Sequence, residues 1–250
     1  MYYYIMEPAG RKELVWQERV KSILGDLGIA GETVSPSPAR TIEELASLGI
    51  VKGYSTIVAV GSENIVDKIV TALINQKGNK EVVLGIIPEN YNSAMARMLG
   101  VSDLRDACNT LKFRKLSTID ACFIEPNKYF LTEAIIESHR TIDSYLILDN
   151  IKAGLPFNRI IIKPGLKITI EDNSLQKDSP NKLLGWLFGK KQTGINNSFF
   201  RSKNLKIETI NTNIPVKVDD EVIAKTPIVC RNRSKVLKII VARDTINLKE

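Results

Sequence analysis

Histidine and cysteine are scarce in this 250-residue sequence, and their scarcity excludes several kinds of chemistry. A single histidine, His139, excludes a multi-histidine metal site and argues against a Ser-His-Asp triad. The three cysteines, Cys108, Cys122 and Cys230, are far apart and odd in number, so they form neither a disulfide framework nor a CxxC zinc pattern. This use of cysteine fits a reducing compartment.

Long apolar runs are also missing. No run approaches the roughly 18 residues that would cross a bilayer, and the N-terminus lacks the basic and apolar regions of a signal peptide. The composition is 44% hydrophobic and 25% charged, which is ordinary for globular proteins. We therefore expect a cytoplasmic protein with one large domain or two modest ones.

Charge is distributed unevenly along the chain. Residues 1–150 carry 16 basic and 19 acidic side chains, whereas residues 151–250 carry 19 basic and 9 acidic ones, within an overall charge of +7. This asymmetry favours an anionic partner for the second half, such as phosphate, nucleic acid or a membrane surface. The alternative is a lysine-rich surface that only keeps the protein in solution.

The first hundred residues alternate between strand and helix patterns. Apolar runs predict strands over 2–6, 55–60 and 82–87, and helical periodicity predicts helices over 11–27, 65–74 and 94–99. Thr41 begins a capping box that opens a further short helix. Near-continuous apolar strands between helices indicate a parallel sheet that is covered on both faces.

Short β-like runs separated by turn residues replace this pattern after about residue 111, and only 134–148 and 181–190 have a helical pattern. The sequence therefore predicts two domains. Residues 1–112 form an α/β nucleotide-binding-like domain with a parallel sheet, and residues 113–250 form an antiparallel, β-sandwich-like domain.

Several short motifs carry a family resemblance. Ile57–Gly61 resembles the segment around the Gly-Gly-Asp-Gly-Thr motif of the diacylglycerol kinase catalytic-domain family. Gly85–Pro88 and Ala96–Val101 are similar to its second motif, Gly-Ile-Ile-Pro-x-Gly-Thr-x-Asn-Asp-Phe-Ala-Arg-x-Leu-Gly. Glu7–Gly10 is similar to an opening Asn-Pro-x-Ser-Gly, and Val216–Glu221 to Val-x-Val-Asp-Gly-Glu. The motifs follow one another in the family's order.

The resemblance implies a two-domain lipid kinase with a fold like that of NAD kinases. In such an enzyme the N-terminal domain binds ATP, and the C-terminal domain helps to bind the lipid whose hydroxyl receives the γ-phosphate. Mg²⁺ is held through acidic side chains and water. The nucleotide-binding positions that it implies are Gly61, Ser62, Glu63, Asn64, Asn90, Asn92 and Ser93.

The resemblance also implies acidic site residues. Glu63 and Asp120 stand at metal-binding positions, and Asp219 with Glu221 stands where a general base is expected. Each assignment has a structural alternative, because Asp120 also fits a capping carboxylate and Asp219 also fits a hairpin turn.

The departures from the family fall on the chemistry. Ser62 puts a Cβ where a glycine lets phosphate approach the backbone, although Asn64 is able to take the left-handed conformation of the turn. Glu63 keeps its charge but is one methylene longer than the family's Asp. Ala94 stands at the Asp position of the second motif, which removes one carboxylate of the Mg²⁺ network.

Phosphoryl transfer depends on the placement of charge and metal. We therefore expect a lipid-kinase-like protein whose transfer is lost or strongly altered, and which acts as a weak nucleotide- or lipid-binding or interaction module. The alternative is an active kinase that uses ATP and Mg²⁺ to phosphorylate a diacylglycerol-like lipid.

A lysine-flanked apolar segment suggests a membrane contact. Trp186, Leu187 and Phe188 precede Lys190 and Lys191, a composition typical of interfacial anchors. We expect peripheral association with a lipid head group or the anionic inner face of a membrane; the alternative is a segment packed on the β domain. Nucleic acid is disfavoured because the basic residues form no known binding motif. Protein partners and homo-oligomers stay open.

Overall fold

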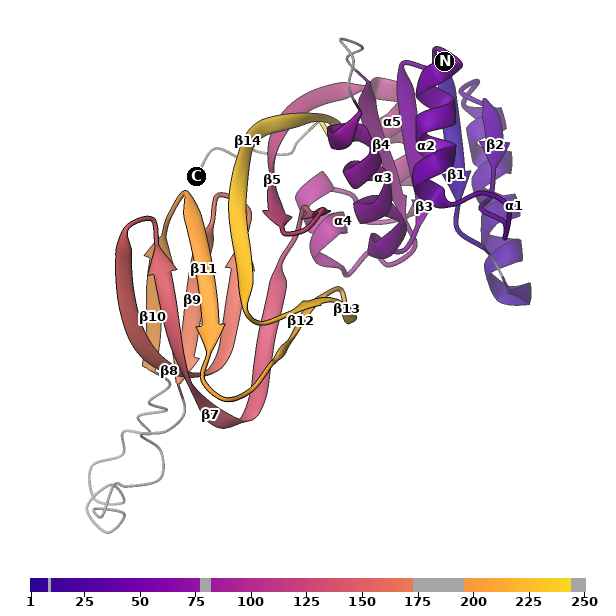
Figure 1. The fold of residues 1–250 in the computed structure, drawn as a ribbon. Helices are drawn as coiled ribbons and strands as arrows, with labels where there is room; N and C mark the ends of the chain where they lie inside the picture. Colours follow the sequence, from indigo (N-terminus) through magenta and orange to yellow (C-terminus); the bar gives the residue numbers. More distant parts are fainter. Residues whose placement is uncertain (9, 77–81, 173–195, 244–250) are drawn as a thin grey trace. The chain divides into compact units, whose positions relative to one another are not determined.

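The computed structural model describes residues 1–8, 10–76, 82–172 and 196–243 (Figure 1). The helix expected over 181–190 and the segment from Trp186 to Lys191 lie outside the described residues. Two compact units are present. Unit 1 contains Met1–Ala121, Asn127–Thr132 and Arg233–Glu250, and unit 2 contains Cys122–Pro126 and Glu133–Asn232. The units are interleaved along the chain, whereas the sequence predicted a single boundary at residue 112.

A parallel sheet forms the centre of unit 1. Its strands follow the order β2-β1-β3-β4-β14, where β14 contributes its C-terminal part through Lys238 and Ile239. The bounds are β1 (Tyr2–Met6), β2 (Glu32–Val34), β3 (Thr56–Gly61), β4 (Val83–Pro88) and β14 (Ile228–Val241). Every residue of β3 and β4 is buried, which confirms the predicted buried parallel sheet.

Helices cover both faces of this sheet. Tyr3 and Ile57 of the sheet lie against Gly49 of α2. Val58 lies against Gly85, which also contacts Leu111 of α5. Because neighbouring residues of a strand point to opposite faces, α2 and α5 lie on opposite faces; α3 packs with α2, and α1 packs with α5. The helices are α1 (Arg11–Asp26), α2 (Ile42–Val51), α3 (Glu63–Asn75), α4 (Ala94–Leu99) and α5 (Leu104–Phe113).

Side-chain caps fix where several of these helices begin and end. The predicted capping box is present, since the Thr41 hydroxyl accepts from the Glu44 N–H while the Glu44 carboxylate accepts from the Thr41 N–H. Ser93 and Asp103 cap α4 and α5 with one side-chain bond each, accepting from the Ala96 and Asp106 N–H groups. Gly100, with a φ of +74°, ends α4 at the predicted residue.

Unit 2 is antiparallel and is organised around one long hairpin of β7 (Ala134–Leu148) and β8 (Ile151–Lys163). The register of the hairpin shifts between Glu137 and Ile142, where the paired strands bend (Figure 1). On one side of the bend, β8 pairs with β9 (Lys167–Asp172), which pairs with β10 (Asn196–Arg201). On the other side, β7 pairs with β11 (Asn204–Thr209), which pairs with the N-terminal part of β14. Unit 2 also contains β12 (Pro215–Val218) and β13 (Glu221–Lys225), whereas β6 (Lys128–Phe130) and most of β5 (Lys115–Ile124) belong to unit 1.

The helix predicted over residues 134–148 is wrong, because this segment is β7. Its second half alternates, with Ile142, Ser144 and Leu146 buried and Asp143 and Tyr145 exposed. That period of two suits a strand with one buried face, and partners on both sides supply its backbone hydrogen bonds. The antiparallel, strand-rich class predicted for this half is confirmed.

Gly85 provides a test of the packing between β4 and α5. A Cβ at this position would lie 2.7 Å from Leu111 Cδ2 and 3.1 Å from Val58 Cγ2. We expect Gly85→Ala to lower the free energy of unfolding by roughly 1–3 kcal/mol, as overpacking does. Gly25→Ala on α1 is the control, since a Cβ there meets nothing within 4 Å. Urea unfolding midpoints of the two variants measure the difference, and equal midpoints would contradict the packing described.

Candidate functional site

Three loops begin at the carboxyl edge of the parallel sheet in unit 1. Glu7, Ser62 and Glu89 directly follow β1, β3 and β4, and this edge is where ligands bind in α/β folds. Backbone bonds hold the loop starts together: the Glu7 N–H donates to Val60 O and the Glu89 N–H donates to Gly61 O, both at 3.0 Å. The first residues of all three loops therefore share one edge.

The Glu7 carboxylate binds the loop that follows β3. Its Oε2 accepts from the Ser62 N–H at 2.7 Å, and its Oε1 accepts from the Ser62 hydroxyl at 2.7 Å. The Gln17 amide donates to the Glu7 carbonyl at 2.7 Å and fixes the backbone behind it. Ser62 is the N-cap of α3, and N–H groups at a helix N-terminus are natural anion ligands. An internal carboxylate thus lies where the resemblance implies a phosphate.

Gly61 is required by this arrangement. Its φ is +144°, and a Cβ would lie 2.6 Å from Glu7 Oε2 and 2.8 Å from Glu7 Cβ. Asn64 does not take the left-handed conformation that is open to it, because α3 begins at Glu63 and Asn64 is helical. The turn is made one residue before α3's N-cap instead, by the glycine that the motif retains.

The loop after β4 uses its polar groups within itself. Asn90 Oδ1 accepts from the Asn92 N–H at 3.0 Å, and Ser93 Oγ accepts from the Ala96 N–H at 3.1 Å. Arg97 Nη1 donates to the Asn92 carbonyl at 2.6 Å. The three nucleotide-binding positions predicted here, Asn90, Asn92 and Ser93, therefore stabilise their own turn and helix cap.

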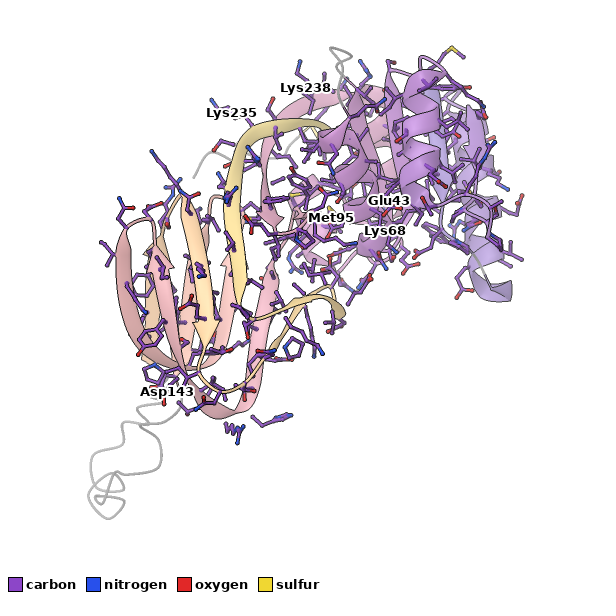
Figure 2. All side chains as sticks on the ribbon, viewed as in Figure 1. Glu43, Lys68, Met95, Asp143, Lys235 and Lys238 are labelled. Atoms are coloured by element: carbon purple, nitrogen blue, oxygen red, sulfur yellow. The ribbon has the colours of Figure 1, made fainter. Side chains whose placement is uncertain are left out.

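Glu63 connects the two loops. Its Oε1 accepts from the backbone N–H of Met95 at 3.2 Å, in the first turn of α4; Met95 is labelled in Figure 2. A side chain predicted to contact metal and nucleotide therefore contacts a helix N-terminus. The N-terminal turns of α3 and α4 each receive a carboxylate from the chain itself, from Glu7 and Glu63.

Acidic side chains concentrate at this edge. Burial raises the pKa of Glu89, and the Glu7 and Glu13 carboxylates raise it further. Because the charges of Glu7 and Glu13 act on Glu89, the three carboxylates share one negative field. Such a field opposes the approach of a triphosphate.

Tyr91 anchors the loop after β4. Burial raises the pKa of its hydroxyl, Cys108 and Asp103 raise it further, and Trp16 and Arg19 lower it; these residues belong to α5, its N-cap and α1. The ring therefore points toward the α1–α5 layer. This loop is tied to the helices rather than left open for a ligand.

Asp120, the second predicted metal ligand, also contacts backbone. Its Oδ1 accepts from the Lys235 N–H at 2.8 Å, where β14 carries a positive φ of +52° (Lys235 is labelled in Figure 2). Among the described residues no group of three or more His, Cys, Asp or Glu side chains is placed to hold a metal ion. The acidic residues present do not fit the Mg²⁺ site that the resemblance implies.

Asp219 and Glu221 lie on the β12–β13 hairpin of unit 2. Asp219 and Asp220 form its two-residue turn, with φ values of +49° and +65°, and Glu221 pairs with Val218 to begin β13. Positive φ at both central residues defines a type I′ turn, which aspartate tolerates. The turn that the sequence offered as the alternative for Asp219 is present, and a general base at these residues stays a prediction.

Glu7 is the site residue that the sequence analysis did not select. The signal for it was a single position, because Glu7 stands where the family's opening motif has Asn. Nothing local indicates its partner, since 55 residues separate Glu7 from Ser62.

The two units together have the fold of diacylglycerol kinases. A crystal structure of a protein assigned as a diacylglycerol kinase, from Bacillus anthracis strain Sterne, superposes with a TM-score of 0.76 at 13% identity, over 98% of both chains. Two further structures from this strain, a diacylglycerol kinase and a protein assigned as one, give TM-scores of 0.72 and 0.75 at 14% identity, again over 98% of both chains. The lipid-kinase fold expected from the motifs is thereby confirmed.

Other comparisons add no family. No protein-family profile matches the sequence, and no curated protein matches it. In the described part of the chain, no helix combines the length and the apolar character that a membrane span requires.

The acidic edge gives a pH-dependent prediction. The pKa of Glu89 is raised above its ordinary value of 4.5, so its ionised form destabilises the folded state at neutral pH, and this cost disappears as Glu89 is protonated. We expect Glu89→Gln to raise the free energy of unfolding at about pH 7 by less than about 1 kcal/mol, because Glu89 is largely solvated. The gain should vanish below about pH 4. Urea unfolding at both pH values measures it, and a gain independent of pH would contradict the shared field.

Proposed function

We propose that this chain is a diacylglycerol-kinase-fold protein that does not transfer phosphate at its α/β edge and instead binds an anionic lipid surface through unit 2. The observation that carries the first part is the Glu7 carboxylate, which occupies both the N–H and the hydroxyl of Ser62. The second part rests on one outward face of unit 2, where Arg201, Lys167 and Lys163 are aligned beside the exposed Phe199.

A nucleotide phosphate at Ser62 would gain less free energy than the displacement of the Glu7 carboxylate costs. A hydrogen bond to a charged group contributes about 1.5–3 kcal/mol, and the carboxylate is supplied by the same chain, so it is always present at high effective concentration. A phosphate at Ser62 would also lie in the negative field that Glu7, Glu13 and Glu89 share. Both effects favour the internal carboxylate over a phosphate.

Metal binding meets a similar obstacle. The Glu63 and Asp120 carboxylates both accept backbone N–H groups, and Ala94 brings no carboxylate at the position where the family has Asp. Phosphoryl transfer needs the metal and the phosphates placed together. We therefore propose neither ATP nor Mg²⁺ as a working cofactor of this edge.

Removal of the Glu7 carboxylate tests the proposal. We expect the wild-type protein to show no binding of ATP with Mg²⁺ at millimolar concentration by isothermal titration calorimetry. Glu7→Ala should bind inorganic phosphate measurably, because it uncovers the Ser62 N–H. Glu13→Ala is the matched control, since it removes the same charge from the shared field without uncovering that group. Thermal unfolding of each variant shows that the fold is retained.

The active kinase remains the alternative outcome. Transfer of radiolabelled phosphate from ATP to diacylglycerol vesicles by the wild-type protein, dependent on Mg²⁺ and abolished in Asp219→Asn, would overturn the proposal. Tight ATP binding by the wild-type protein would do the same.

A further inference from the structure

One outward face of unit 2 combines an apolar row with a basic row. The strand registers align Phe199 with Thr169, Ile161 and Ile135 across β10, β9, β8 and β7. One pair further along β10, the register aligns Arg201 with Lys167 and Lys163. We call these seven residues the Phe199 face: Phe199, Thr169, Ile161, Ile135, Arg201, Lys167 and Lys163.

Burial shows which way this face points. Ile168 and Ile170 of β9 and Ile160 and Ile162 of β8 are buried to within a few percent, so the residues between them point outward. Phe199 is 72% exposed. An aromatic side chain this exposed, in line with three partly exposed neighbours, forms an apolar strip on the outside of the sheet.

The basic row places three like charges side by side. Arg201, Lys167 and Lys163 are directly opposite one another on neighbouring strands, and like charges in that arrangement are destabilising. Lys163 has a carboxylate partner at 3.3 Å in Glu133, the residue just before β7. Three cations aligned on one exposed face favour an anionic partner.

The carboxylates on the other side of the apolar row do not repel an anionic partner strongly. Glu171 pairs with Arg159 at 3.9 Å, and Glu137 pairs with Lys217 at 3.2 Å. Glu171, Arg159 and Glu137 are aligned across β9, β8 and β7, and Lys217 lies on the neighbouring β12. The positive charge of the face is therefore concentrated in the row beside Phe199.

We propose that the Phe199 face docks on an anionic membrane surface, with Phe199 inserted among the lipids and the basic row on the lipid phosphates; this inference rests on the lipid-binding function proposed above. Apolar side chains beside cations are what an interfacial contact requires. Single-stranded nucleic acid is favoured less, because its bases stack on a series of aromatic side chains, and the row behind Phe199 continues with Thr169 and isoleucines.

Charge reversal at the centre of the row separates docking from folding. Lys167→Glu places a carboxylate opposite Arg201 on one side and Lys163 on the other, so we expect the melting temperature to rise or stay unchanged. Affinity for vesicles of phosphatidylglycerol and phosphatidylcholine should fall roughly tenfold or more. Lys203→Glu is the matched control, an exposed lysine outside the face, and should change affinity by less than about threefold.

A second pair of variants isolates the apolar contribution. Phe199→Ser should weaken vesicle binding roughly tenfold, and this loss should persist at high salt because burial of an aromatic ring is not screened. Ile151→Ser is the control, since Ile151 is 70% exposed but lies outside the face. Co-sedimentation at low and high salt measures all four variants.

The outcomes are distinct. If the wild-type protein ignores anionic vesicles altogether, both the lipid-binding function and this docking face are wrong. If it binds but Lys167→Glu and Lys203→Glu weaken it equally, the function stands and the assignment of this face is overturned. Tighter binding to single-stranded nucleic acid than to vesicles, lost in Phe199→Ser, would also overturn it.

Discussion

The bond between the Glu7 carboxylate and Ser62 is the constraint on which the carboxyl edge of unit 1 depends. The bond joins the loops after β1 and β3 and requires a glycine at position 61. The charge of the same carboxylate contributes to the raised pKa of Glu89. Helix N-terminal groups that favour an anion are here satisfied by carboxylates of the same chain. The scaffold therefore stays intact although the residues that would contact phosphate have changed.

The two units use charge in opposite ways. At the edge of unit 1, carboxylates occupy helix N-termini and are stabilised by backbone N–H groups. On the Phe199 face of unit 2, basic side chains are directly opposite one another on neighbouring strands, and like charges so placed repel. Charges that are satisfied by their own chain need no partner, whereas like charges aligned on an exposed face favour an anionic one.

The sequence was sufficient where the determinants are local. Buried strands, the Thr41 capping box and the Gly100 helix end follow from neighbouring residues, and each is present. The segment that became β7 has a mixed pattern, and partners far along the chain decided its conformation. The candidate site shows the same difference between local and distant determinants. The altered loop residues could be read from the sequence, but the bond from Glu7 to Ser62 joins residues 55 positions apart. Helix α5 was not predicted from the sequence.

Strand β14 has a consequence for how this protein can be divided. Its N-terminal residues pair with β11 in unit 2, and Lys238 and Ile239 pair with β4 in unit 1, so a single strand near the end of the chain completes the sheets of both. No single cut in the gene yields two whole domains. A fragment ending near residue 112 would expose the edge of β4, a fully buried strand and a ready template for aggregation. Recombination that exchanges one unit between relatives therefore needs more than one crossover.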